Sequence, residues 1–416
     1  MEFRLFLKKF QDDDEIKVVS DRIDCREFPG HIVAEEKREN RTVLFENISG
    51  CRGKMVGNLF GSQERINQSF EVTETSAIFD KIDHAVANPR SLKVITPDQH
   101  EYGRSSNPAL MEHLPPIIHS HHDSTPYITS GVVLARNPDS GKHHLCFVRL
   151  SVQDSNVVLF NPQTPRIKEM VAKTVGRGNP LDVAILIGSP TEIMLLGALS
   201  FSDEIDELQV AQALGGESLR FFEHGLPVPM STEVILFGKV LPEYRHEGPF
   251  GELTGMYSTH SNPICVVDEL WERKEFVYHS ILGGVSCEHV ALVSLKARHE
   301  LEQLKNQSAH ILDYRLPRFA AGKLCLLVVA DGFSKDDVVR DLFNVPLVKL
   351  FVLLNEDTDI RCSDDVLWAL TQRMSGAGDF NFSDENPVKG LASKTIVDAT
   401  VDDLSDWSNV RVEVYE

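Results

Sequence analysis

At 416 residues the chain is too long for one ordinary hydrophobic core, so two or three domains are expected. Its formal net charge of −20 at pH 7 disfavours nucleic acid or an anionic membrane face as the main partner, because a polyanion would be repelled. No segment approaches the roughly 20 apolar residues of a membrane span, and the amino terminus lacks a signal-peptide pattern. The seven cysteines are scattered without a CxxC pair and indicate reduced thiols, as expected of a cytoplasmic protein.

The first part of the chain, residues 1–115, is predicted to form an N-terminal α/β domain. Phe3–Phe10 has the spacing of a helix, and Thr42–Phe45 that of a strand. Between Glu101 and Pro126 the pattern dissolves into Pro, His, Ser and Asn. This composition indicates a long connection that crosses between domains.

Short strand signals dominate residues 116–286. Many short strands separated by turn residues predict a β-barrel or a β-sandwich. The expected strands are Tyr127–Ala135, Leu145–Val152, Asn156–Phe160, Val183–Ile187, Glu233–Leu241 and Ile264–Val267.

An apolar stripe at helical spacing predicts a helix from Glu288 to Asn306, and residues 287–310 are interpreted as a link between domains. Residues 311–416 follow a βαβα order, which predicts a separate C-terminal α/β domain and a mixed α/β (α+β) fold class for the chain. The expected elements are a strand Leu324–Ala330, a helix capped by Ser334, a strand Leu347–Leu354 and a helix capped by Ser363.

The segment from His246 to Glu252 (HEGPFGE) holds two carboxylates in a stretch that cannot be helical. Pro249 lacks the N–H that a helix interior needs, and two glycines let the backbone turn. Glu247 and Glu252 are therefore predicted to be loop acids behind a strand, a position where catalytic side chains are often displayed. The alternative is that both are solvated loop charges.

Arg149 lies in the stretch predicted to be a strand, where alternation puts it on one face with Leu145 and Phe147. A guanidinium in such apolar surroundings needs a partner, most often a buried carboxylate. It would hold that acid ionised, while a second acid in a drier setting could keep its proton. The alternative is a structural ion pair, or an arginine whose head reaches water.

Glu247 to Glu252 (EGPFGE), followed by Thr254-Gly255-Met256-Tyr257-Ser258, resembles the E-G-P-F-G-E/D and T-G-x-Y-S motifs of the UbiD-like (de)carboxylases, which use a prenylated flavin. The resemblance covers nearly the whole chain. It extends to residues 123–141, 226–240, 355–374 and 397–400.

The resemblance implies a split β-barrel that binds prenylated FMN at residues 116–286 and a C-terminal oligomerisation domain at 311–416. It implies non-oxidative decarboxylation of an aromatic or α,β-unsaturated carboxylic acid, with carboxylation as the reverse reaction. Arg149, Glu247 and Glu252 match the family's arginine, the glutamate paired with it and the glutamate that shuttles the proton. The chemistry agrees, because loss of carbon dioxide leaves a carbanion that needs an electron sink, and no side chain is one. A flavin prenyltransferase as cofactor supplier and a homodimer or larger homo-oligomer are implied as well.

The family binds the flavin phosphate through a divalent metal (Mn²⁺ or Mg²⁺) and K⁺, with an Asn, a His and a Glu. Glu207 matches the Glu, and His144 and Thr164 stand where the Asn and the His are expected. His144 and Glu207 are therefore the expected metal ligands, in a set unusual for the family. Further cofactor contacts are expected at Val148, Arg149, Gln163, Thr164 and Lys349.

Two other functional interpretations stay open. One is a flavin-binding member of the family whose altered metal site has left little or no decarboxylase activity. Another is a strand-barrel oxidoreductase that uses ordinary FMN and a nicotinamide. Three histidines close in sequence could suggest a metal cluster, but they are interpreted as solvated loop side chains: His119, His121 and His122.

Overall fold

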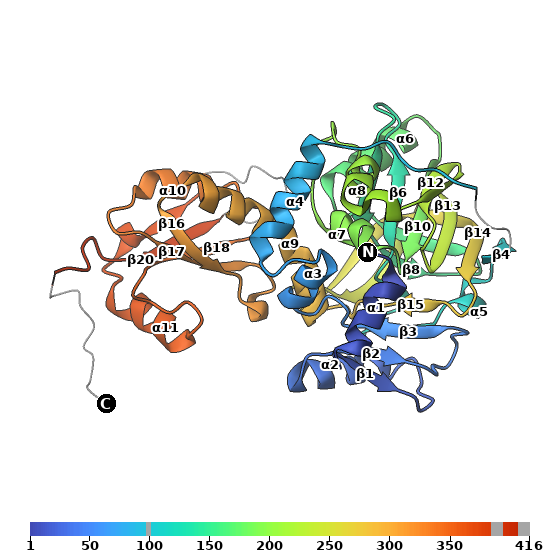
Figure 1. The fold of residues 1–416 in the computed structure, drawn as a ribbon, viewed down its shortest axis with the longest axis horizontal. Coiled ribbons are helices and arrows are strands. Elements are labelled where there is room, and N and C mark those ends of the chain that lie inside the picture. The colour runs from blue at the N-terminus through green and yellow to red at the C-terminus, as the bar shows by residue number, and fades with distance from the viewer. Residues whose placement is uncertain (97–100, 384–393, 407–416) are drawn as a thin grey trace. The chain divides into compact units, whose positions relative to one another are not determined.

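The computed structural model describes residues 1–96, 101–383 and 394–406 (Figure 1). The chain divides into two compact units, Met1–Leu292 and Val293–Glu416. The dividing point lies inside helix α9 (Cys287–Gln307). The bounds of α9 confirm the helix expected from Glu288 to Asn306. The mixed α/β fold class is confirmed, whereas the finer division into four segments stays a prediction.

The first unit begins with a small four-stranded sheet in the order β1-β2-β3-β15. Helix α1 buries Phe3, Phe6, Leu7 and Phe10, the spacing of one helical face, and confirms the helix expected there. The strand expected at Thr42–Phe45 is confirmed as β2. The elements are β1 (Ile16–Val19), β2 (Thr42–Phe45), β3 (Lys54–Gly57), β15 (Val277–His279), α1 (Phe3–Asp12), α2 (Phe28–Arg38), α3 (Gln63–Ser69) and α4 (Thr75–Ala87).

The long connection expected over residues 101–126 contains secondary structure in its first half. Strand β4 (Tyr102–Ser106) pairs antiparallel with β14 (Tyr257–Arg273), and helix α5 (Leu110–His113) follows. The hydroxyl of Tyr102 donates to the carbonyl oxygens of Met230 and Thr232. Because a partner more than 150 residues away stabilises β4, local composition gave no sign of it.

A second, nine-stranded antiparallel sheet forms most of the first unit, in the order β5-β8-β9-β14-β13-β10-β6-β7, with β4 on β14. The remaining strands are β5 (Tyr127–Ile128), β6 (Val132–Arg136), β7 (His143–Phe147), β8 (Arg149–Val152), β9 (Val157–Asn161), β10 (Leu181–Ile187) and β13 (Val234–Gly251). A hairpin, β11 (Phe221–His224) and β12 (Leu226–Pro229), lies beside it.

Two of the expected strands are each broken in the middle, and this break bends the sheet into a half-barrel. Tyr127–Ala135 becomes β5 and β6, and Leu145–Val152 becomes β7 and β8 around Val148. β5 pairs with β8, and β6 pairs with β7. Gly131 permits the bend, because a Cβ there would lie 2.8 Å from the side chain of Ile185.

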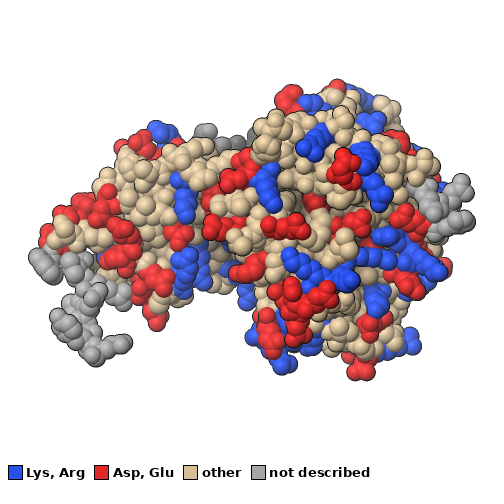
Figure 2. Space-filling view, in the orientation of Figure 1, with Lys and Arg blue, Asp and Glu red and all other residues tan. Residues whose placement is uncertain are grey.

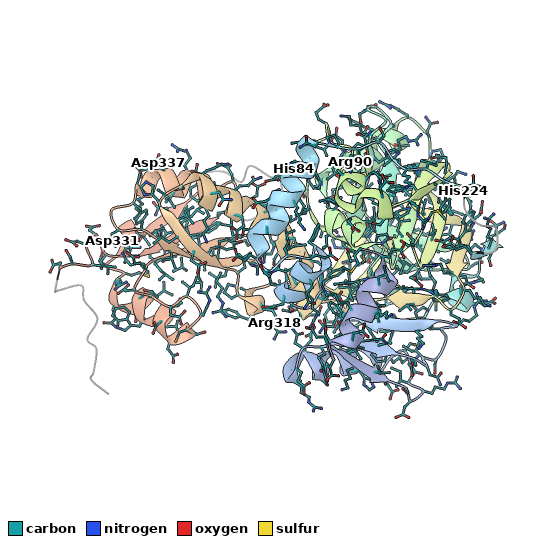
Figure 3. The ribbon with its side chains drawn as sticks, viewed as in Figure 1. His84, Arg90, His224, Arg318, Asp331 and Asp337 are labelled. Atoms are coloured by element: carbon teal, nitrogen blue, oxygen red, sulfur yellow. The ribbon has the colours of Figure 1, made fainter. Side chains whose placement is uncertain are left out.

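Helices pack on the barrel, and α6 contributes to the apolar core that fills it. Helix α7 contacts β6 and β7, and α6 contacts β10 and β13. The helices are α6 (Pro165–Gly176), α7 (Thr191–Ala198), α8 (Glu207–Gly215) and the short η1 (Gly216–Ser218). At the rim, His224 (Figure 3) packs on Trp271, with ring centroids 4.7 Å apart.

The acid segment is strand rather than loop, which corrects the expectation for Glu247. β13 continues to Gly251 and pairs with β14 across irregularities, the last of them between Glu247 and Phe250. Pro249 falls in this irregularity, where a missing N–H breaks no ladder hydrogen bond. Glu247 therefore lies on a strand, and Glu252 directly follows the strand end.

The second unit is a five-stranded sheet in the order β16-β17-β18-β20-β19 with helices on both faces (Figure 1). α9 and α10 pack on one face, and α11 packs on the other. The elements are β16 (Ile311–Arg315), η2 (Arg318–Ala320), β17 (Leu324–Val329), α10 (Lys335–Leu342), β18 (Leu350–Asn355), α11 (Ser363–Gln372), η3 (Ala377–Asp379), β19 (Phe380–Phe382) and β20 (Thr395–Ala399).

The expected βαβα order of this unit is confirmed, with one correction. Ser334 is the N-cap of α10, and Asp337 (Figure 3) lies in its first turn. In α11 the N-cap is Cys362, so Ser363 begins the helix instead of capping it. A one-residue error at a helix end is the usual uncertainty of sequence patterns.

The surface charges, the cysteines and the helices can each be compared with what the composition predicts. Figure 2 shows acidic and basic side chains intermixed on the face that it draws. None of the seven cysteines, all within the described ranges, forms a disulfide. Across the described ranges, no helix combines the length and apolar character needed to cross a bilayer.

Candidate active site

Arg149 joins the two acids of the HEGPFGE segment. Its Nε donates to Glu247 Oε1 at 2.8 Å, and its Nη1 donates to Glu252 Oε1 at 2.7 Å. The guanidinium carbon lies 4.4 Å from the ring centroid of Phe250, which backs the group from one side. The structure therefore brings together the three residues expected to be catalytic.

The two carboxylates have opposite environments. The side chain of Glu247 is fully buried, and burial raises its pKa above the usual value even though Arg149 opposes the shift. The side chain of Glu252 is 27% exposed. Burial opposes its ionisation, but Arg149, Ser258 and His260 outweigh this and lower its pKa. One guanidinium thus holds a buried acid that gains a proton easily and a half-buried acid that is ionised at neutral pH.

A row of polar side chains on β14 surrounds these acids. Ser258, His260 and Asn262 alternate along the strand and so face the same side. The hydroxyl of Ser258 donates to Glu252 and lies 3.0 Å from His260 Nε2, which is 3.5 Å from Glu252 Oε1. Asn262 donates to Glu247 through its side-chain amide. Since His260 is 35% exposed, the row connects Glu252 with solvent.

The chain before the barrel fixes the end of β13. Asp123 accepts hydrogen bonds from the backbone N–H groups of His119, Ser120 and Gly251, at 2.9 to 3.0 Å. Its carboxylate therefore holds the backbone just before Glu252 in place.

The interpretation of His119 as a solvated loop side chain is wrong. It is 5% exposed, and its Nδ1 accepts from the backbone N–H of Gly283. Burial lowers its pKa to about 4. The next two histidines, His121 and His122, are exposed as expected.

A second cluster gathers the residues expected at the cofactor phosphate. Asp206 caps α8 and accepts from the backbone N–H and ring of His143, which sets the neighbouring Glu207 against β7. His144 Nδ1 lies 2.9 Å from Glu207 Oε1, and Arg166 Nη1 donates to the same oxygen at 2.7 Å. Glu207 thus has a histidine and an arginine as partners.

These residues do not fit a divalent metal ion. No group of three or more His, Cys, Asp or Glu side chains suited to a metal occurs in the described ranges. Burial opposes a charge on His144, but Cys146 and Glu207 outweigh it and raise its pKa to about 10. Arg166 adds a permanent positive charge on the Glu207 carboxylate, which a metal ion would need as a ligand. His144 and Glu207 meet as expected, but as an ion pair.

The same residues do fit the polar end of a flavin nucleotide. His144 Nε2 and Thr164 Oγ1 are buried and have no hydrogen-bond partner within the described ranges. Thr164 directly precedes α6, whose first turn presents backbone N–H groups. Unpartnered buried polar atoms beside a helix N-terminus are suited to a ligand that carries acceptor oxygens.

Three expected cofactor contacts are less informative. Val148 is buried, and its backbone N–H donates to Gly131. Gln163 is exposed, and its amide donates to Asn161. Lys349 belongs to the second unit, where its backbone N–H donates to Lys323, so its role stays a prediction.

The sequence patterns missed Arg166, His260, Asn262 and Asp123. Two signals were present. A basic residue in the first turn of a helix opposes the helix dipole, and Arg166 is such a residue, which marks the need for an acidic partner. His260 and Asn262 continue a period of two that begins at Ser258.

Comparison with protein families matches most of the chain. Residues 7–86, 93–286 and 290–399 match the N-terminal, Rift-related and C-terminal domains of the UbiD family, described as 3-octaprenyl-4-hydroxybenzoate carboxy-lyase. Two curated relatives are named anhydromevalonate phosphate decarboxylase. The protein from Methanocaldococcus jannaschii is 28% identical over 83% of this chain and 82% of its own length. The one from Methanothermobacter thermautotrophicus is 27% identical over 90% and 89%.

Solved structures of this class have the same fold. The enzyme HmfF from Pelotomaculum thermopropionicum in complex with prFMN gives a TM-score of 0.87 at 24% identity, over 99% of this chain and 97% of that one. Vanillic acid decarboxylase from Sedimentibacter hydroxybenzoicus gives 0.82 at 21% identity, over 100% and 95%. At these identities the likeness establishes the fold.

Proposed function

The chain belongs to the UbiD family of carboxy-lyases, and we propose that it decarboxylates an α,β-unsaturated or aromatic carboxylic acid with prenylated FMN as its cofactor. The observation that supports this most strongly is the bridge that Arg149 makes between Glu247 and Glu252. When bound, the cofactor supplies the electron sink that loss of carbon dioxide requires. The side chains of the protein bind the acid and move the proton.

We assign Arg149 to the substrate carboxylate. A guanidinium binds carboxylates through paired hydrogen bonds. Among the described residues, Arg149 has two acids as charged partners, Glu247 and Glu252. An incoming carboxylate competes with Glu252, the more exposed of the two, for the Nη1 donor. Glu247 is buried and also accepts from Asn262, so it keeps Arg149 in position.

Competition for Arg149 also favours protonation of Glu252. Arg149 is the strongest influence that lowers the pKa of Glu252, so a substrate carboxylate that takes up the guanidinium raises this pKa. Glu252 then gains a proton from solvent through Ser258 and His260. After carbon dioxide has left, the protonated Glu252 delivers this proton to carbon.

The substrate proposal starts from the curated relatives. Since both are named for anhydromevalonate phosphate, this acid is the first to test, followed by aromatic acids such as vanillic acid. The cofactor would come from a flavin prenyltransferase. We propose a homo-oligomer in solution, which light scattering measures directly.

The test is release of carbon dioxide from these acids by protein produced together with a flavin prenyltransferase. We expect turnover of at least one acid, and none by protein produced without the prenyltransferase. Protein that carries the prenylated flavin and is inert on every acid would contradict the proposal.

That negative result would favour a second candidate, a flavin-binding protein without decarboxylase activity. The observation in its favour is Arg166 on Glu207, where the family has a metal ion. The family match gives no support to a nicotinamide-linked oxidoreductase, which would bleach a yellow FMN on addition of NADPH.

A further inference from the structure

Arg166 forms an ion pair with Glu207, which is an expected metal ligand. Its Nη1 donates to Glu207 Oε1 at 2.7 Å and its Nη2 to the carbonyl oxygen of Ile205 at 3.0 Å. Its Nε lies 2.9 Å from a carboxylate oxygen of Asp203. The Arg166 side chain is only 8% exposed and that of Glu207 is 1% exposed, so this ion pair is buried, whereas Asp203 lies at the surface.

A guanidinium and a divalent cation bound to the same Glu207 carboxylate would repel each other. The guanidinium does not lose its proton in proteins, so a metal on the same carboxylate would face a fixed positive charge a few ångström away. Burial keeps water from screening that repulsion. Glu207 already has its counter-ion in the chain itself.

Apart from its two acidic partners, Arg166 has neighbouring groups that are suited to bind an anion. Arg166 is the second residue of α6, a helix of 12 residues that begins at Pro165. Proline has no N–H, so the free donors of the first turn are the backbone N–H groups of Arg166 and Ile167. Independently, His144 is 4% exposed and its Nε2 has no hydrogen-bond partner in the described residues. His144 shares the oxygen Glu207 Oε1 with Arg166, which places it in the same cluster. The hydroxyl of Thr164, directly before α6, is also unpartnered.

We propose that Arg166 replaces the divalent metal of this family. It neutralises Glu207 and, with the first turn of α6, Thr164 and His144, holds the phosphate of a flavin mononucleotide without a metal ion. This rests on the proposed function, because it assumes a flavin cofactor. It deepens that proposal by naming a phosphate site built from side chains and backbone N–H groups alone.

The first test uses the unaltered chain. Protein is stripped with EDTA, checked for residual metal by mass spectrometry, and titrated with FMN and with riboflavin in the absence and presence of Mn²⁺. We expect FMN to bind the stripped protein more tightly than riboflavin, with a dissociation constant that Mn²⁺ changes by less than about twofold. An FMN affinity that appears only with Mn²⁺, or a metal bound in equal amount to the chain, would overturn the inference.

The second test removes the guanidinium. Arg166→Gln alone removes one of the two cationic partners of the buried Glu207 carboxylate, so the Arg166→Gln/Glu207→Gln variant is made as well. We expect FMN to bind each variant about tenfold or more weakly, as for loss of one charge-assisted hydrogen bond, with riboflavin affinity unchanged. Arg177→Gln is the matched control, since Arg177 lies just beyond the other end of α6 and pairs with exposed Asp139.

The outcomes separate this inference from the function on which it rests. Unchanged FMN affinity in the folded double variant would overturn the phosphate site, while decarboxylation could still stand. Unaltered protein that binds neither FMN nor riboflavin would contradict both.

Discussion

A single guanidinium serves two carboxylates that differ in burial, and this difference sets their proposed roles. Glu247 is buried with a raised pKa and is suited to hold Arg149 in place. Glu252 is more exposed, has a lowered pKa and contacts a polar row that reaches solvent. The sequence motif predicted which residues meet. It did not predict that the acid expected to carry the proton is the more easily ionised one, because that depends on Ser258 and His260, which β14 brings in.

The polar row gives the first prediction, which concerns His260. His260→Asn can still contact Ser258 but cannot carry a proton. We expect kcat to fall about tenfold, less than the 10²–10⁴ typical of a direct acid, with KM and bound flavin unchanged. Added imidazole should restore part of the rate. A loss of kcat that imidazole does not restore, accompanied by loss of flavin, would indicate a structural role instead.

Arg166 and the expected metal ligands illustrate which contacts residue patterns can predict and which they cannot. The sequence predicted that His144 and Glu207 lie together, and they do. Arg166 was missed because its partner comes from α8, 41 residues later, and a contact of that kind follows from how the helices pack.

At the scale of elements, the two acids lie at the end of β13 and directly after it. Gly248 between them has no room for a side chain. A Cβ on Gly248 would lie 2.5 Å from Ser124 Oγ and 2.6 Å from Ser124 Cβ. Contacts this short force one of the two segments to move. The segment from Ser120 to Ser124 is therefore the template against which the acids are set.

The second prediction is that Gly248→Ala lowers kcat strongly while the protein stays folded. We expect a cost of about 1–3 kcal/mol in unfolding free energy, as for other overpacked sites. Ser124→Gly in the same chain removes both contacting atoms and should restore most of the activity. If the double variant is no more active than Gly248→Ala alone, crowding by Ser124 is not the cause.

The sequence predicted elements best where a segment has its own periodicity. α1 and α9 were placed within a residue or two, since each carries its apolar stripe locally. β4 was missed and β13 was predicted too short, because both are stabilised by pairing with the distant strand β14. The bend at Gly131 likewise depends on Ile185, which the local pattern cannot reveal.

At the scale of the molecule, the first unit encloses a neutral histidine that resists protonation. His119 packs between Phe28 and Phe250 and has a pKa of about 4, well below the usual 6.5. Between pH 6.5 and 4 the unfolded chain binds a proton that the folded chain does not. Stability from this site is therefore present above pH 6.5 and is lost as pH falls toward 4.

The third prediction follows from that sign. Between pH 7 and 4.5, His119 alone should cost the folded chain about 2 kcal/mol of unfolding free energy. In His119→Gln, whose amide oxygen can still accept from Gly283, this part of the loss should disappear. Urea unfolding of both proteins at the two pH values measures it. An equal loss in both would show that His119 titrates normally.

The order of strands in the barrel is the part of the whole molecule that the sequence left open. Composition and turn spacing allowed a barrel or a sandwich, and the resemblance to the family suggested the split barrel. The two broken strands decide the geometry, and they place β8, which holds Arg149, within reach of the ends of β13 and β14.

The most direct test of the central claim compares carbon dioxide release by the unaltered protein and by Glu252→Gln at equal content of prenylated flavin. The amide keeps the shape of the side chain and removes the proton donor. We expect turnover to fall at least about a thousandfold with flavin binding unchanged. Glu243→Gln, which changes an exposed acid on β13, should behave like the unaltered protein. Full turnover by Glu252→Gln would contradict the account.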